Sequence, residues 1–196
     1  MKLIGLTGTT GSGKGYVAAL FAQVGIDSID TDAVVHRLYR QDAACIAELE
    51  AAFGAVLAED GSVDRKKLAS IVFADCEKLA MLNSIVHRYV KREVERICLA
   101  KEREGCDLIL LDAPLLYEAK MENLCDRVIA VVAPEPIRVM RICARDGIDE
   151  PAAMRRINNQ HTDAFFEENA DYVICNDGQA SVQEQINCII GELRNG

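Results

Sequence analysis

Eight consecutive residues near the amino terminus combine the residue types that bind phosphate. Residues 8–15 read G-T-T-G-S-G-K-G and contain the pattern G-x-x-x-x-G-K, which ends at Lys14. Because glycine has no Cβ, successive backbone N–H groups can converge on one anion. Lys14 adds a full positive charge, and a helix beginning near Gly13 adds the positive end of its dipole. The residues expected to form this phosphate site are Gly8, Thr9, Thr10, Gly11, Ser12, Gly13, Lys14, Gly15 and Tyr16.

The last position of this loop departs from the usual pattern. A Ser or Thr normally follows the lysine and places its hydroxyl on Mg²⁺, but here the residue is Gly15. A Gly-Lys-Gly sequence does occur in loops of the adenylate kinase type. The metal would then be held through water or by another residue, since the hydroxyls of Thr7, Thr9, Thr10 and Ser12 lie at other offsets.

Three aspartates follow predicted strands at 26–29 and 107–111, where the carboxyl ends of parallel strands place ligands. In extended backbone Asp30 and Asp32 would share a face. A carboxylate there can accept the proton of an attacking hydroxyl or hold Mg²⁺, whereas the alternative is a helix cap. The chemical role is favoured for Asp32 and the cap for Asp30. For Asp112 a metal or water-orienting role and a structural one both stay open.

Arginines are concentrated after the fourth predicted strand. Arg138, Arg141 and Arg145 are three and four residues apart and are predicted to share one helix face. A solvated charged face is the usual meaning of such spacing. In small kinases with a phosphate loop, however, a mobile lid occupies this place and neutralises the transferring phosphoryl group. We favour that role for Arg141 and Arg145.

The elements that must position these groups alternate as in a parallel α/β sheet. Short apolar runs at 2–6, 26–29, 107–111, 127–132 and 172–175 predict five strands, the first of them central. The intervals between them show helical spacing, and 33–103 is helical with no strand of the sheet. The fold class predicted is α/β, a three-layer P-loop kinase fold with a five-stranded parallel sheet, a helical insertion and a lid.

Composition limits the classes of function. The 196 residues carry a net charge of −9, which disfavours nucleic acid as a partner. The eight cysteines form no C-x-x-C pair, so reduced thiols in a cytoplasmic protein are expected. No apolar run reaches the length of a membrane span and no signal peptide is recognisable. We therefore expect no membrane association, and a monomer or weak oligomer.

Taken together, these motifs resemble the dephospho-CoA kinase family over nearly the whole chain. The motifs that carry the resemblance are IGLTG at 4–8, GSGK at 11–14, IDTD at 29–32, the set Asp60, Gly61, Arg65, Leu68 and Phe73, Leu82 and Asn83 with His87, PLLYE at 114–118, and the set Arg141, Arg145, Asp146, Gln160, Ala170, Asp171 and Asn176.

The resemblance implies ATP-dependent phosphorylation of the ribose 3′-hydroxyl of dephospho-CoA, with Mg²⁺, to give coenzyme A and ADP. It implies that Asp32 is the general base, that Lys14 holds the ATP phosphates, and that Arg141 and Arg145 belong to the lid. Asn176 would lie near the adenine of ATP. Arg65, His87, Leu115, Leu116, Tyr117 and Glu118 would line the acceptor side, and Asp32 and Asp112 would hold the metal through water.

The same resemblance suggests three parts of the chain. A nucleotide-binding core would comprise 1–32, 104–133 and 169–196, a helical acceptor region 33–103, and a helical lid 134–168. Besides Gly15, the chain departs from the family at Arg88, which replaces a proline, and at Glu167 and Glu168, where a basic residue is often found. The alternatives are another small-molecule kinase of the nucleoside monophosphate type and a non-catalytic nucleotide-binding paralogue.

Overall fold

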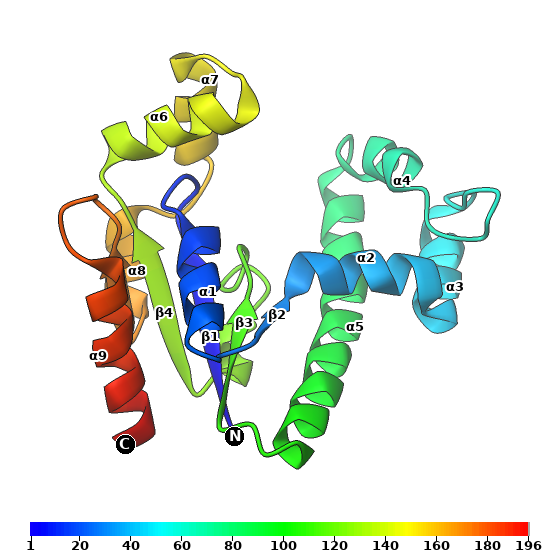
Figure 1. The fold of residues 1–196 in the computed structure, drawn as a ribbon. Coiled ribbons are helices and arrows are strands. Elements are labelled where there is room, and N and C mark those ends of the chain that lie inside the picture. Colours follow the sequence, from blue (N-terminus) through cyan, green and yellow to red (C-terminus); the bar gives the residue numbers. More distant parts are fainter. Residues whose placement is uncertain (196) are drawn as a thin grey trace. The chain divides into compact units, whose positions relative to one another are not determined.

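The computed structural model describes residues 1–195, and within them the chain forms a five-stranded parallel sheet (Figure 1). The strands are β1 (Lys2–Gly8), β2 (Ser28–Asp30), β3 (Leu108–Asp112), β4 (Arg127–Val132) and β5 (Tyr172–Cys175). Their order is β2-β3-β1-β4-β5, so β1 is central. The predicted fold class and the central position of the first strand are confirmed.

Nine α-helices connect these strands in the described residues. They are α1 (Lys14–Gln23), α2 (Thr31–Gln41), α3 (Ala43–Phe53), α4 (Arg65–Val72), α5 (Cys76–Arg103), α6 (Glu135–Asp146), α7 (Glu150–Asn158), α8 (Asp163–Asn169) and α9 (Val182–Asn195), with a short 3₁₀ turn at Glu122–Leu124. None of them has the length and apolar character needed to span a bilayer.

The chain divides into two compact units, one made of Met1–Ser28 with Asp107–Gly196 and the other of Ile29–Cys106. In the first unit, alternate residues of the central strand face opposite layers, as the pleat requires. Ile4 and Leu6 are fully buried in one core, which α1 and α9 cover. On the other face Phe166 of α8 packs against Ala130 and Val132 of β4.

The second unit consists of α2 to α5 packed on one another. Each of these helices begins after an aspartate whose carboxylate accepts backbone N–H groups of the first turn: Asp30, Asp42, Asp64 and Asp75. Such a cap satisfies donors that otherwise have no partner, and typically stabilises a helix by ~1 kcal/mol. The prediction that 33–103 contributes no strand to the sheet holds, because its one described β-bridge pairs Leu57 with Val63.

One local prediction was wrong. We expected extended backbone through Asp30 and Asp32, with both carboxylates on one face. Instead α2 begins at Thr31, and the Asp30 carboxylate accepts the N–H groups of Asp32 and Ala33 at 2.8 and 3.2 Å. The capping bonds that aspartate can make turn the chain into the helix immediately after the strand. Asp30 is therefore the cap, and Asp32 is an exposed residue of the first turn.

Candidate active site

The glycine-rich loop continues directly from the end of the central strand. Gly8 has φ +151° and lies so close to β4 that a Cβ there would collide with the carbonyl oxygen of Val131. Gly13 has φ +94°, and a Cβ on it would collide with the side-chain amide of Asn176. Both positions therefore require glycine, because the loop is folded tightly against β4 and the residue after β5.

The helix that follows the loop leaves its amino-terminal end available to an anion. Its N-cap is Gly13, which has no side chain to accept the first N–H groups, and its first turn contains no acidic residue. The uncapped N–H groups and the positive end of the helix dipole attract negative charge. This end of α1 thus has the chemistry that the loop pattern predicts for an anion site.

A cavity of about 510 Å³ opens beside this loop. Its walls are formed by Gly8, Thr9, Thr10, Gly11, Gly13, Lys14, Gly15, Pro114, Arg141, Arg145 and Gln160. Tyr16, which we expected in the site, points to solvent with 56% of its surface exposed, and Ser12 is buried beneath the loop. The hydroxyls of Thr9 and Ser12 are buried and find no hydrogen-bond partner among the described residues.

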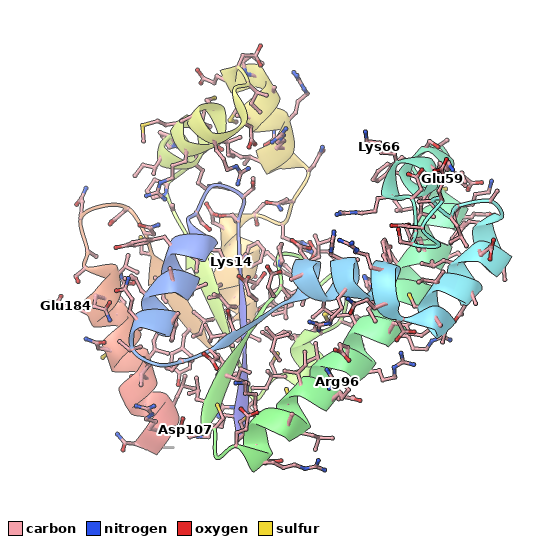
Figure 2. The ribbon with its side chains drawn as sticks, turned by 45° about the vertical axis from the view of Figure 1, so that its right-hand side comes forward. Lys14, Glu59, Lys66, Arg96, Asp107 and Glu184 are labelled. Carbon is pink, nitrogen blue, oxygen red and sulfur yellow. The ribbon has the colours of Figure 1, made fainter. Side chains whose placement is uncertain are left out.

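Lys14 is the first residue of α1 (Figure 2). Its side chain lines this cavity. The ammonium forms an ion pair with the carboxylate of Asp112 at the end of β3. Their side chains are 19% and 15% exposed, so neither group is fully solvated. The structure thus brings the predicted phosphate-binding lysine and the candidate metal carboxylate into direct contact.

Helix α6 carries the two arginines that line the cavity. The guanidinium of Arg141 donates to the carbonyl oxygens of Gly11 and Ser12 at 3.4 and 3.0 Å, and to that of Asn176 at 3.2 Å. Arg145 instead makes a bidentate ion pair with Asp146, which raises the pKa of the Arg145 guanidinium. Both groups add positive charge beside the phosphate loop.

Arg138 does not share their environment, although the spacing predicted one common face. Its side chain is 6% exposed and its guanidinium pairs with Asp163 of α8 at 3.1 Å. The helix face turns enough over three residues for Arg138 to enter the protein while Arg141 reaches the loop. This ion pair fastens the beginning of α6 to α8.

Asn176 follows β5 and is buried. Its side-chain amide donates to the carbonyl oxygen of Ser12 at 2.7 Å, and its carbonyl oxygen accepts from Arg141 at 3.4 Å. These two hydrogen bonds connect Asn176 to the glycine-rich loop and to Arg141.

The segment 115–118, expected on the acceptor side, presents its residues in different directions. Leu115 is 53% exposed, whereas Leu116 is fully buried next to Gly5, which leaves no side-chain surface for a ligand. Tyr117 lies edge-to-face on Phe165 with 5.2 Å between ring centroids, and burial raises the pKa of its phenol to about 12. The carboxylate of Glu118 lies 3.8 Å from the His161 imidazole.

The other predicted site residues belong to the helical unit. Asp32 is exposed in the first turn of α2, and Arg65 is the exposed first residue of α4. His87 is half-buried on α5, where burial and the charge of Lys91 lower the pKa of its imidazole. The sequence analysis did not assign Pro114 or Gln160 to the site. A signal existed for both, since Pro114 belongs to the PLLYE motif at 114–118 and Gln160 to the last set of motif residues.

Comparisons with known proteins agree with this geometry. A family model described as dephospho-CoA kinase matches residues 2–182. The chain belongs to the dephospho-CoA kinase family. A dephospho-CoA kinase of Corynebacterium diphtheriae is 37% identical over 187 residues, which cover 95% of this chain and 94% of the relative.

Solved structures show the same similarity. A Thermus thermophilus protein superposes with a TM-score of 0.78 at 32% identity, covering 98% of this chain and 97% of the other. A dephospho-CoA kinase from Campylobacter jejuni has a TM-score of 0.65 at 23% identity, with 100% and 98% covered. The second likeness shows the fold, and the family model and the first relative show the family.

The Lys14–Asp112 pair generates a prediction for nucleotide binding. Lys14→Ala removes a cation from the cavity and leaves the Asp112 carboxylate to repel phosphates. Charge-assisted hydrogen bonds contribute roughly 1.5–3 kcal/mol each, so ATP affinity should fall about 10- to 150-fold. Calorimetric titration with ATP measures this change. Lys2→Ala, at the opposite end of β1, is the matched control, and an unchanged affinity of Lys14→Ala would show that this loop does not bind phosphate.

Proposed function

We propose that this protein transfers the γ-phosphoryl group of ATP to the ribose 3′-hydroxyl of dephospho-CoA and releases coenzyme A and ADP. The observation that carries this proposal is the cavity of the glycine-rich loop, which unites Lys14, Arg141 and Arg145 in a chain of the dephospho-CoA kinase family. Phosphoryl transfer needs mainly positioning and neutralisation of negative charge, and this cavity supplies both.

The loop residues and the lid arginines would have different roles toward ATP. The backbone N–H groups at the start of α1 and the Lys14 ammonium would bind the phosphate chain, because both are positive and convergent. Arg141 is held by carbonyl oxygens of the loop itself, and Arg145 by Asp146. Their fixed guanidinium groups would stabilise the charge that spreads over the transferring phosphoryl group.

Asp32 is proposed as the general base that accepts the proton of the ribose hydroxyl. Its carboxylate is exposed, and its helix is already capped by Asp30, so the fold does not need it as a cap. A proton acceptor must be available as the new P–O bond forms, and a carboxylate following a parallel strand fits that role.

Mg²⁺ is proposed as the metal that accompanies ATP. This ion commonly binds one or two carboxylates together with substrate phosphates and waters, and it would neutralise phosphate charge. Asp112 fits this chemistry, since its carboxylate already faces a phosphate-binding cation, and Asp32 would be the second carboxylate.

The acceptor would be held by Arg65, His87, Leu115, Tyr117 and Glu118. Arg65 supplies a permanent positive charge for an anionic acceptor. We propose that 33–103 binds the acceptor, that 134–168 acts as the lid, and that 1–32, 104–133 and 169–196 form the nucleotide-binding core. The burial of Leu116 gives that residue a packing role within this arrangement.

The direct test is ADP release from ATP in the presence of dephospho-CoA. We expect turnover with dephospho-CoA that exceeds turnover with AMP or a nucleoside by orders of magnitude, because those acceptors lack the pantetheine part. Product analysis should show a new phosphate on the ribose 3′-oxygen. Faster turnover with AMP than with dephospho-CoA would contradict the proposal.

Asp32→Asn separates chemistry from folding. The substitution keeps the size of the side chain but removes the base, so turnover should fall roughly 10²-fold or more while ATP affinity stays within a few-fold. Asp30→Ala is the complementary variant, expected to lose ~1 kcal/mol of stability with the lost cap and to keep most of its turnover. Thermal unfolding and steady-state kinetics measure both. A folded Asp32→Asn protein with normal turnover would rule out the base assignment.

Gly15 offers a test of metal binding. A Cβ at this helical position meets no atom within 4 Å, so Gly15→Ser should fold normally, with stability equal or higher by about 0.5 kcal/mol. The new hydroxyl should lower the Mg²⁺ concentration at which ATP affinity is half-maximal. Gly191→Ser, equally open on α9, is the control. An unchanged Mg²⁺ requirement in the folded Gly15→Ser protein would show that this position does not face the metal.

A further inference from the structure

Gln160 connects the turn that follows α7 to the glycine-rich loop. It follows α7, and its side-chain oxygen Oε1 accepts the backbone N–H of Thr10 at 2.7 Å. The residue also forms part of the wall of the 510 Å³ cavity together with Lys14 and Arg141. A loop amide that belongs to the phosphate site is thus held by a neutral side chain from a distant part of the sequence.

This contact determines the orientation of the carboxamide. A backbone N–H can only donate, so the atom that faces Thr10 must be the oxygen, and the NH₂ group occupies the other branch. No acceptor for that NH₂ group is found among residues 1–195. Two N–H donors are therefore available on a residue that lines the cavity.

The neighbouring residues hold Gln160 in place. The backbone N–H of Gln160 donates to the carbonyl oxygen of Ile157 at 3.2 Å, which completes the end of α7. On the other side, the His161 ring stacks on Phe165 with 3.8 Å between centroids, and the Thr162 hydroxyl caps α8 by accepting the N–H of Phe165. A side chain on such a restrained backbone loses little freedom when it binds a ligand.

The charge of the side chain matters at this position. Arg141 donates to loop carbonyls and Gln160 accepts from a loop amide, so the lid contacts both kinds of backbone group in the same loop. A carboxylate could accept from Thr10 equally well, but it would place negative charge beside the phosphates. A carboxamide satisfies the loop and still presents donors.

We propose that Gln160 is a nucleotide-binding residue whose side-chain oxygen positions the Thr10 amide and whose NH₂ group donates to the phosphate chain in the cavity. The assignment rests on the proposed use of this cavity for ATP. It makes the end of α7 a contributor to nucleotide recognition, in addition to the arginines of α6.

Two substitutions distinguish this role from a purely structural one. Gln160→Met keeps the length but removes both functions, and should weaken ATP binding about three- to tenfold. Gln160→Glu keeps the acceptor for Thr10 but replaces the donors by a negative oxygen, and should weaken ATP binding at least about tenfold. Calorimetric titration with ATP, without an acceptor, measures both, and thermal unfolding verifies the fold. Gln23→Glu, at the far end of α1, is the charge control.

A structural role predicts the opposite order. If Gln160 only holds the loop, Gln160→Glu keeps the hydrogen bond to Thr10 and loses affinity only through its added charge, so it is impaired less than Gln160→Met. That result overturns the proposal, as does unchanged ATP affinity in Gln160→Met. Since no acceptor is present, these outcomes do not depend on turnover of dephospho-CoA. Absence of turnover in the wild type would instead contradict the proposed reaction.

Discussion

The close packing of the glycine-rich loop, residues 8–14, at the end of the central strand is the constraint on which the rest of the structure depends. The chain has a net charge of −9, so it has no general attraction for a polyanion. A phosphate chain can be bound only where local dipoles and a few cations overcome that charge. The glycine-rich loop lines a cavity together with Arg141 and Arg145, and it packs so tightly against β4 and Asn176 that side chains are excluded at Gly8 and Gly13.

The parallel sheet supplies the rigid support that this loop needs. Central strand β1 is hydrogen-bonded on both sides, by β3 and β4, and its residues Ile4 and Leu6 are buried under α1 and α9. Asp112 is the last residue of β3, which pairs with β1, and its carboxylate lies beside the Lys14 ammonium group. The ion pair lies at the cavity, where a phosphate ligand would provide further negative charge for the same lysine.

The lid is connected to the loop by polar contacts of complementary type. Arg141 of α6 binds loop carbonyls and Gln160 binds a loop amide, whereas Arg138 pairs with Asp163 and joins α6 to α8. Each of these bonds joins segments more than twenty residues apart. Hydrogen bonds of this kind contribute only about 0.5–1.5 kcal/mol net each, so they can exchange for bonds to a ligand.

Sequence alone determined the phosphate loop, the parallel sheet with its central first strand, and the family, because these depend on local patterns: glycines with a lysine, apolar runs, and motifs in a given order. Tertiary structure decided the partners of the polar side chains. It separated Arg138 from Arg141, buried Leu116, and brought Gln160 to Thr10. Residues 10 and 160 are too distant in the chain for any local pattern to pair them, and only the folding of α7 and the following turn around the loop brings the two groups within hydrogen-bond distance.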